Sequence, residues 1–293
     1  ASIVEVEQQN PLTITSGKID KDLEKWLFRQ VVQEGERLKN LMTKLWSGIT
    51  WKKNHRVLVL TPSSLLWSLK PLREVIEGGV ILAASKDNHP RLLDELEVLA
   101  PMERPVLLDL KVESIKKLED NLKFEVIGGR IPWKVFSEKK FLELWPTLTE
   151  KCTDNAQLSL IISNPCSGPA LSLKENLEGY ISEENNDFSL LNNLITKEEK
   201  WLHNQNQKNK FVLQLEKLGW DIIFEEWTES LYLKVDTSII KRWLDKGSEY
   251  RENILENFEE DTLIRLKELF IRLDGKTIKQ KLLHTKLVGK INN

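Results

Sequence analysis

The sequence has few cysteines and no long apolar run, and each scarcity excludes a class of protein. Its 293 residues contain two cysteines, Cys152 and Cys166, which are too few for a disulfide framework. Neither lies near any of the four histidines at the spacing of metal ligands, so no zinc site is predicted. No stretch of about 18 apolar residues occurs, so no membrane span is expected. We therefore expect a protein of a reducing, cytoplasmic compartment.

A net charge of one sign is also lacking. The 43 basic and 45 acidic side chains leave a formal charge of −2, which excludes a general attraction to nucleic acid or to an acidic surface. The glycine-rich loop with Lys-Ser/Thr that marks P-loop ATPases is absent, so this chain carries no ATPase motif of that kind. The chain also lacks an initiator methionine and a signal-peptide pattern, so we expect a piece of a longer protein or a processed N-terminus.

Short apolar runs alternate with amphipathic helical stretches through the first half of the chain. Nearly continuous apolar runs are typical of strands covered on both faces. Their alternation with helices predicts right-handed βαβ crossovers and a parallel, doubly wound sheet. The five expected strands are Arg56–Leu60, Val80–Ala84, Pro105–Leu108, Phe124–Ile127 and Gln157–Ser163. The expected helices are Asp20–Trp46, Leu65–Ile76, Pro90–Leu99, Glu113–Asp120 and Glu138–Leu148.

An antiparallel hairpin is predicted after these units, because two β-rich runs, Trp220–Trp227 and Leu231–Val235, have only three residues between them. Five parallel units followed by a hairpin resemble the class I S-adenosylmethionine (SAM) methyltransferases over about Leu23–Asp236. The resemblance implies an α/β fold with a doubly wound, seven-stranded Rossmann-like sheet of order 3-2-1-4-5-7-6. Its last strand would be antiparallel, and the sheet would carry helical N- and C-terminal additions.

The expected organisation has three parts. An N-terminal extension occupies residues 1–19, the methyltransferase-like α/β domain residues 20–236, and a helical C-terminal extension residues 237–293. Within the α/β domain, the polar stretch of about 172–210 interrupts the alternation of strands and helices and is expected to be an insertion on the surface. The C-terminal extension is expected to end in a lysine-rich tail.

The stretch after the first strand departs from the SAM-binding pattern of the family. The family has glycines there, because a side chain would collide with the methionine part of the cofactor. This chain has Thr61–Ser64, in which Pro62 fixes φ and removes an N–H donor. The second strand ends at Ser85 where the family has an acid for the ribose hydroxyls. Asp109, after the third strand, matches the family's acidic residue near the adenine.

These departures predict a vestigial cofactor site. No cofactor is established by the residues, and SAM is the one that the fold would accommodate. Catalytic residues stay unassigned, since Asp87, Asp109 and Glu225 are equal candidates for a general base. The residues expected to line the vestigial site are Thr61, Ser63, Ser64, Ser85, Asp109 and Gly129.

A second motif, Asn164–Gly168 (NPCSG), follows the fifth strand. It resembles the P-C-S-G of RNA cytosine-5 methyltransferases, whose cysteine adds to the base ring, and more loosely the N-P-P-Y of amino methyltransferases. In those families the motif follows the fourth strand, and the RNA enzymes have a further catalytic cysteine downstream, whereas no cysteine follows Cys166. A turn built from Asn, Pro, Ser and Gly is therefore the favoured interpretation, with a nucleophilic thiol as the alternative.

The C-terminal segment is basic and has no acidic residue among its lysines. Lysines of this kind contact nucleic-acid phosphates in some proteins and form a solvated surface in others. No aromatic residue lies among them in sequence to stack on a base. The candidates for contact with DNA are Lys276, Lys279, Lys281 and Lys286.

Five short stretches, spread over most of the chain, resemble a narrower group. They are Arg56–Leu60, Glu77–Val80, Glu103–Leu108, Phe124–Arg130 and Lys241–Trp243. The group is the methyltransferase-like domain fused to cyanobacterial RarA/MgsA-type (replication-associated recombination) AAA+ ATPases. The resemblance implies a non-catalytic accessory or scaffold domain in DNA replication or recombination repair. Its partner would be the ATPase region of the same polypeptide or complex.

Two rival functions remain from the residues alone. One is an active SAM-dependent methyltransferase with a divergent cofactor loop, acting on nucleic acid or on a small molecule. The other is a crevice, at the carboxyl ends of the strands, that binds a different nucleotide-like ligand.

Overall fold

The computed structural model describes residues 35–177, 186–202, 205–248 and 250–291. The predicted N-terminal extension and the first part of the predicted helix Asp20–Trp46 lie outside the described residues. No helix in the described part is both long and apolar enough to cross a membrane.

The chain divides into two compact units that do not follow a single cut in the sequence. The predicted boundary between residues 236 and 237 falls inside the second unit. Unit 1 comprises residues 1–163, 209–225 and 285–293, and unit 2 comprises residues 164–208 and 226–284.

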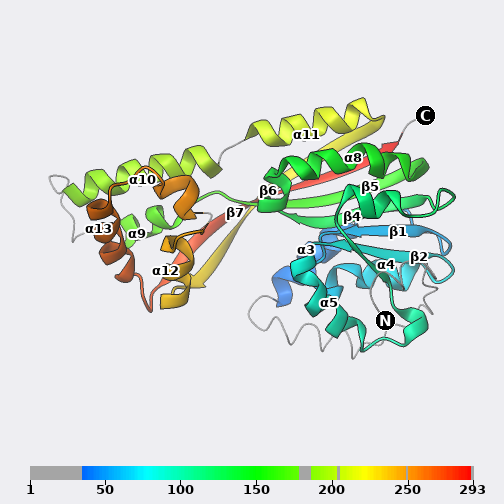
Figure 1. Ribbon diagram of the computed structural model, residues 1–293, viewed down its shortest axis with the longest axis horizontal. Coiled ribbons are helices and arrows are strands. Elements are labelled where there is room, and N and C mark those ends of the chain that lie inside the picture. Colours follow the sequence, from blue (N-terminus) through cyan, green and yellow to red (C-terminus); the bar gives the residue numbers. More distant parts are fainter. Residues whose placement is uncertain (1–34, 178–185, 203–204, 249, 292–293) are drawn as a thin grey trace. The chain divides into compact units, whose positions relative to one another are not determined.

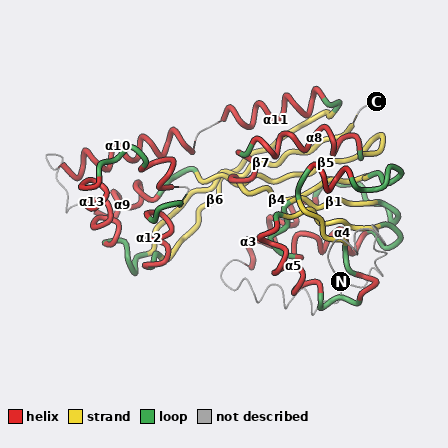
Figure 2. The backbone as a smooth tube through the Cα atoms, viewed as in Figure 1, coloured by secondary structure: helices red, strands yellow, loops and turns green. Residues whose placement is uncertain are grey.

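A seven-stranded sheet organises the chain, and its strand order, β3-β2-β1-β4-β5-β7-β6, confirms the predicted fold. Strands β3, β2, β1, β4 and β5 pair in parallel. The strands are β1 (Arg56–Leu60), β2 (Gly79–Ala84), β3 (Val106–Asp109), β4 (Phe124–Pro132), β5 (Cys152–Pro165), β6 (Trp220–Lys234) and β7 (Thr277–Ile291), as Figures 1 and 2 show.

The predicted hairpin within Trp220–Val235 is wrong. Trp220–Lys234 forms one continuous strand, β6, because the residues between the two runs (Thr-Glu-Ser) contain no glycine or asparagine to begin a tight turn. The antiparallel partner is β7, the segment expected as a lysine-rich tail. At one end of the pair, the backbone N–H of Val235 donates to the carbonyl of Lys276 at 2.8 Å.

Helices cover both faces of the sheet in unit 1. One helical layer packs against the sheet through a shared hydrophobic core. Its members include Ile115, Trp145 and Phe211 of the helices and Ile127 of β4. On the other face, the Trp46 ring packs so closely over Gly128 that an ideal Cβ there would lie 2.3 Å from it. The helices with residues in unit 1 are α3 (Gly35–Trp46), η1 (Leu65–Ser68), α4 (Leu69–Glu74), η2 (Lys86–Asn88), α5 (His89–Leu96), η3 (Pro101–Glu103), α6 (Val112–Lys116), α7 (Trp133–Ser137), α8 (Lys139–Glu150) and α11 (Gln205–Lys217).

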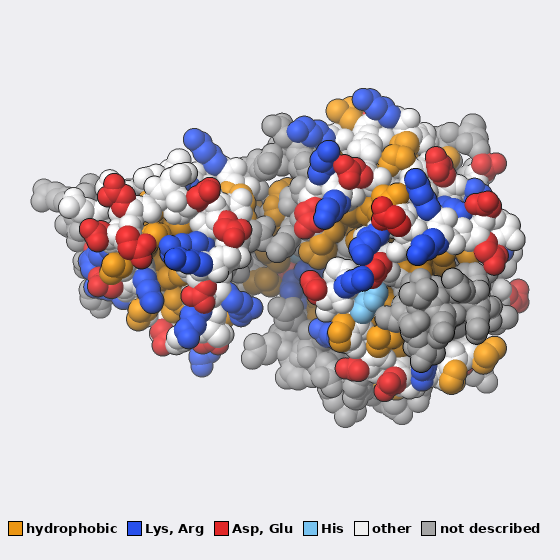
Figure 3. Space-filling view, in the orientation of Figure 1, with side chains coloured by type: hydrophobic (Ala, Val, Ile, Leu, Met, Phe, Trp, Pro, Cys, Tyr) orange, Lys and Arg blue, Asp and Glu red, His pale blue; other side chains and the backbone are white. Residues whose placement is uncertain are grey.

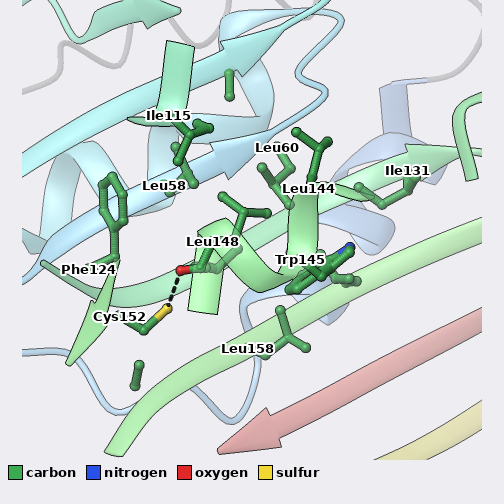
Figure 4. Close-up of a cluster of buried hydrophobic side chains, with 14 of the residues drawn as sticks. Leu58, Leu60, Ile115, Phe124, Ile131, Leu144, Trp145, Leu148, Cys152 and Leu158 are labelled. Carbon is green, nitrogen blue, oxygen red and sulfur yellow. Dashed lines mark hydrogen bonds between the residues drawn. The ribbon is translucent and has the colours of Figure 1, made fainter. Parts of the chain in front are cut away.

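Figure 4 shows part of the first core layer, in which Trp145 and Leu148 of α8 lie over the sheet. Cys152 lies in this cluster and its thiol donates to the carbonyl of Leu148 at 3.2 Å. Burial raises the pKa of Cys152 to about 12, so its thiol stays protonated and inert. This cysteine therefore serves as a small apolar core residue.

Unit 2 has its own helical core. The polar stretch predicted as a surface insertion contributes two helices whose apolar sides are buried in that core, at Leu173, Leu191 and Leu194 among other residues. The ends of β6 and β7 add Val235 and Ile278 to the same core. The helices are α9 (Pro169–Leu177), α10 (Asn186–Leu202), α12 (Thr237–Leu244), the π-helical turn η4 (Arg251–Leu255) and α13 (Glu260–Ile271).

The carboxyl group of Glu198 on α10 is deeply buried in unit 2, where the residue is 1% exposed. Its Oε1 accepts hydrogen bonds from the backbone N–H of Ala170, at 2.9 Å, and from the hydroxyl of Tyr250. An ideal Cβ at Gly168 would lie 2.1 Å from the carboxyl carbon of Glu198, so a side chain there would displace this carboxyl group. Burial raises the pKa of Glu198 to about 7, although the hydrogen bonds from Tyr250 and the backbone act to lower it.

The raised pKa of Glu198 predicts that the protein loses stability as the pH rises. The native state holds this proton more tightly than the unfolded state, whose pKa is near 4.5. The stabilisation is therefore complete below pH 4.5 and is lost as the pH passes 7, a change of about 3 kcal/mol. Urea unfolding at pH 5 and pH 8 should show this loss, and Glu198→Gln should reduce the difference between the two pH values by that amount. An unchanged difference in Glu198→Gln would contradict the assignment.

Candidate functional site

The carboxyl ends of the parallel strands lie side by side in unit 1. Leu60 pairs with Ala83, and Ala84 pairs with Asp109, so the segments after β1, β2 and β3 emerge at one edge of the sheet. We call this edge, with residues Thr61–Ser64, Ser85, Asp109 and Gly129, the cofactor edge. The topology thus brings the predicted site residues to one region, as the carboxyl ends of parallel strands require.

Thr61 adopts a left-handed backbone conformation with φ of 51°. This conformation costs a β-branched residue about 1–3 kcal/mol, and glycine would adopt it without strain. Two hydrogen bonds hold it in place: the N–H of Thr61 donates to Ala83 at 2.8 Å, and its hydroxyl donates to the carbonyl of Arg130 at 2.6 Å. The tight turn after β1 therefore persists without the family's glycine, and its donors are used within the protein.

A buried carboxylate occupies the N-terminus of the helical segment that follows this turn. Glu95 of α5 is 4% exposed and accepts from the N–H of Leu65 at 2.5 Å and from the hydroxyl of Ser64 at 2.9 Å. Arg91 donates to the second oxygen of Glu95 at 3.0 Å. Glu95 is not among the residues predicted from the sequence. Its only signal was an acidic residue four positions after an arginine on an amphipathic helix, which is common on surface helices.

The remaining N–H groups at this helix start are also bonded internally. The hydroxyl of Ser64 accepts from Leu66 at 3.3 Å, and its carbonyl accepts from Trp67 at 3.2 Å. Ser64 is therefore a helix cap, whereas Ser63 is exposed. In a cofactor site, such N–H groups would face the ligand.

Asp109 lies at the end of β3, where the family has its acidic residue near the adenine. Its carboxylate lies among three basic side chains: Lys111 at 3.2 Å, His89 at 3.5 Å and Lys86 at 3.7 Å. His89 is buried, and its Nε2 also lies 3.3 Å from the carbonyl of Ala84. The carboxylate is thus engaged by residues of the same edge. The two lysines are exposed and hold it weakly.

Ser85 and Gly129 have local structural explanations. Ser85 is exposed and precedes the short helix η2 without making a side-chain cap. An ideal Cβ at Gly129 would lie 2.3 Å from the carbonyl oxygen of Leu60, so glycine is required for β4 to pair with β1. After it, the guanidinium of Arg130 lies over the Trp67 ring, 5.4 Å from its centroid.

The candidate general bases are dispersed. Asp109 follows β3 and Glu225 lies on β6, at the two opposite ends of the strand order, so they share no site. Asp87 is exposed on η2. The geometry therefore assembles no acid–base pair from these three residues.

The predicted DNA-contacting lysines are in different surroundings. Lys286 is buried in unit 1, where its Nζ donates to the carbonyl and the hydroxyl of Ser47 at 3.0 and 2.7 Å. Burial lowers its pKa. Lys279 and Lys281 are exposed on β7, and Lys276, just before β7, is half-buried. Figure 3 shows one face of the molecule, on which basic and acidic side chains are interspersed.

Cys166 belongs to unit 2 and lies near the end of the β5 segment. Its N–H donates to the carbonyl of Lys281 at 2.8 Å, and Asn164 holds α10 by donating from its side chain to the carbonyl of Leu202 at 2.8 Å. Burial raises the pKa of Cys166, and the opposing effect of the nearby Lys281 is smaller, so the pKa stays above its ordinary value. A catalytic thiol needs a lowered pKa, so these surroundings favour the turn over the nucleophile.

The strand order of the sheet is that of the class I SAM-dependent methyltransferase fold. No family model matches the sequence, and no curated protein matches it.

Solved structures do resemble the chain. A protein from Bacillus halodurans assigned to the methyltransferases is 12% identical, with 86% of this chain and 99% of that chain covered and a TM-score of 0.48. The YcgJ protein of Bacillus subtilis is 10% identical, with 88% and 99% covered and a TM-score of 0.46. A SAM-dependent methyltransferase from Archaeoglobus fulgidus is 15% identical, with 89% and 99% covered and a TM-score of 0.42.

The two cysteines should differ in reactivity towards a thiol reagent such as DTNB. Cys166 is half-exposed and should react in the native protein, whereas Cys152 is buried, has a pKa of about 12, and should react only on unfolding. Cys166→Ser should abolish the native-state reaction, and Cys152→Ser should leave it unchanged. Equal rates for both thiols in the native protein would be inconsistent with the described core.

Proposed function

We propose that this chain is a degenerate, non-catalytic methyltransferase-fold module. It would act as an accessory or scaffold domain of a RarA-type AAA+ ATPase in DNA replication or recombination repair. The observation that supports the absence of catalysis is the position of the Glu95 carboxylate. It occupies the helix N-terminus that a cofactor would otherwise use.

The residues at the cofactor edge do not fit SAM. The methionine part of SAM needs backbone proximity, but Thr61 and Pro62 stand where the family has small residues. The cofactor's carboxylate would meet a helix start whose donors are already bonded to Glu95 and Ser64. Freeing them would leave one buried oxygen of Glu95 without its two donors, with Arg91 bonded only to the other oxygen, which costs about 1–3 kcal/mol. No methyl-transfer step is therefore assigned to this chain.

A second candidate function, an active methyltransferase with a divergent loop, is favoured by one observation. Asp109 lies at the end of β3, and its side chain is 20% exposed, so solvent still reaches the carboxylate. If SAM binds, this residue is the one that we expect to contact the adenine moiety.

Calorimetric titration with SAM and with S-adenosylhomocysteine separates the two functions. We expect no heat of binding from the folded protein at millimolar ligand, because the helix-start donors are already engaged. An active methyltransferase titrated in parallel gives the positive control, and circular dichroism confirms that the sample is folded. Binding at micromolar strength that Asp109→Asn weakens would overturn the proposal and establish the second candidate.

The scaffold role predicts a physical association with the ATPase region. That region, added in trans, should co-elute with this chain in size-exclusion chromatography with light scattering. The chain should also change the rate of ATP hydrolysis about fivefold or more, the lower end of ordinary allosteric coupling. An unrelated methyltransferase of similar size serves as the control. Separate elution together with an unchanged rate would reject the assigned partner.

A further inference from the structure

The two-stranded β6–β7 ribbon in unit 2 has two faces of different character. On one face, Trp227 stacks on His284 with ring centroids 5.1 Å apart, and the Nε2 of His284 lies 2.9 Å from Glu229. Since side chains alternate along a strand, the neighbouring residues must lie on the other face. We call this second face the ribbon face. It comprises Thr228, Ser230, Tyr232 and Lys234 of β6 and Thr277, Lys279 and Lys281 of β7, all of which are exposed.

An aromatic ring lies among lysines on the ribbon face, although they are distant in sequence. Tyr232 is 74% exposed. Counting from the bonded residues Val235 and Lys276, Tyr232 lies beside Lys279, and Lys281 is the next residue along that face. Lysines two positions apart on a strand are separated by about 7 Å. The ribbon thus supplies the aromatic partner that the lysine segment lacks in sequence.

The lysines of the ribbon face keep their charge available. Among the described residues, Lys234, Lys279 and Lys281 form no ion pair. Two acids continue the same alternation beyond the ends of the face, Glu226 before Thr228 and Asp236 after the end of β6, and both are engaged elsewhere. Glu226 pairs with Lys208 at 2.7 Å, and Asp236 accepts from the N–H of Ile239 at 2.9 Å as the cap of α12.

This combination matches one ligand chemistry. Unpaired lysines at strand spacing attract a chain of phosphates, and an exposed aromatic ring between them offers a surface for stacking on an unpaired base. Exposed serine and threonine hydroxyls on the same face are further donors to phosphate oxygens. An acidic peptide or an anionic membrane would use the lysines but would gain nothing from stacking on Tyr232.

We propose that the ribbon face is a binding site for single-stranded nucleic acid, in which Lys234, Lys279 and Lys281 contact phosphates and Tyr232 stacks on a base. The site uses no residue of the cofactor edge. It goes beyond the scaffold function and stands or falls independently of SAM binding. It also differs from the sequence-based candidate set, because it adds Tyr232 and Lys234 and excludes the buried Lys286.

Fluorescence anisotropy with a labelled oligo-dT tests the site in the full chain at low salt. Tyr232→Ala should weaken binding about fivefold or more, the usual loss for one stacked base. The double variant Lys279→Gln/Lys281→Gln should reduce the slope of log K against log salt by about 1.4, as the loss of two phosphate contacts predicts. A duplex of the same length should bind more weakly, because its bases are already stacked.

Matched variants elsewhere serve as controls. Phe224→Ala removes another exposed aromatic ring, and Lys241→Gln/Lys267→Gln removes two exposed lysines on helices of unit 2. Both should bind oligo-dT like the wild type. All the substituted side chains are exposed, so circular dichroism should show each variant folded.

Three outcomes would overturn the proposal. The first is equal oligo-dT affinity in the wild type and every variant, including no binding at all. The second is binding that depends on the lysines but not on Tyr232 and is matched by polyglutamate, which would indicate a general polyanion surface. The third is preference for phosphatidylserine vesicles over oligo-dT, which would indicate a membrane surface.

Discussion

The insertion of β7 between β5 and β6 is the constraint on which the rest of the structure depends. Because β7 follows β6 in sequence but lies between β5 and β6 in the sheet, the chain completes β6 and then returns along it. The return is made through α12, η4 and α13, which pack with α9 and α10 into one helical core. Unit 2 is therefore built from two excursions of the chain, one that follows β5 and one that joins β6 to β7.

The strands that are buried on both faces were predictable from sequence, and β6 and β7 were not. Val57–Leu60 and Val80–Ala84 are apolar throughout, and the predicted strands Arg56–Leu60 and Val80–Ala84 agree with β1 and β2 to within a residue. In β7, lysines alternate with apolar residues because one face is solvated over part of its length, and that pattern also describes a charged tail. The strand order could still be predicted, because that prediction depended on the number of parallel strand–helix units that precede the antiparallel strands.

Part of the cofactor edge was predictable for the same reason. Residues that follow buried parallel strands must gather at one edge, and Ser64 and Asp109 do so. The role of Glu95 could not be predicted, because its contact with Leu65 joins residues 30 positions apart and depends on how α5 packs. The carboxylate of Glu95 is an anionic partner for this helix start from within the protein.

The late position of β7 in the chain bears on biosynthesis. Until Ile291 has left the ribosome, β5 has no neighbour on its outer side, and β6 has no partner at all. Unpaired strand edges of this length are templates for association between nascent chains. Unit 2 needs the first part of β7, to residue 284, and unit 1 needs the part that follows, so neither unit can close before its part of β7 is available. A nonsense mutation within α13 would remove all of β7 and leave both units incomplete rather than only the second.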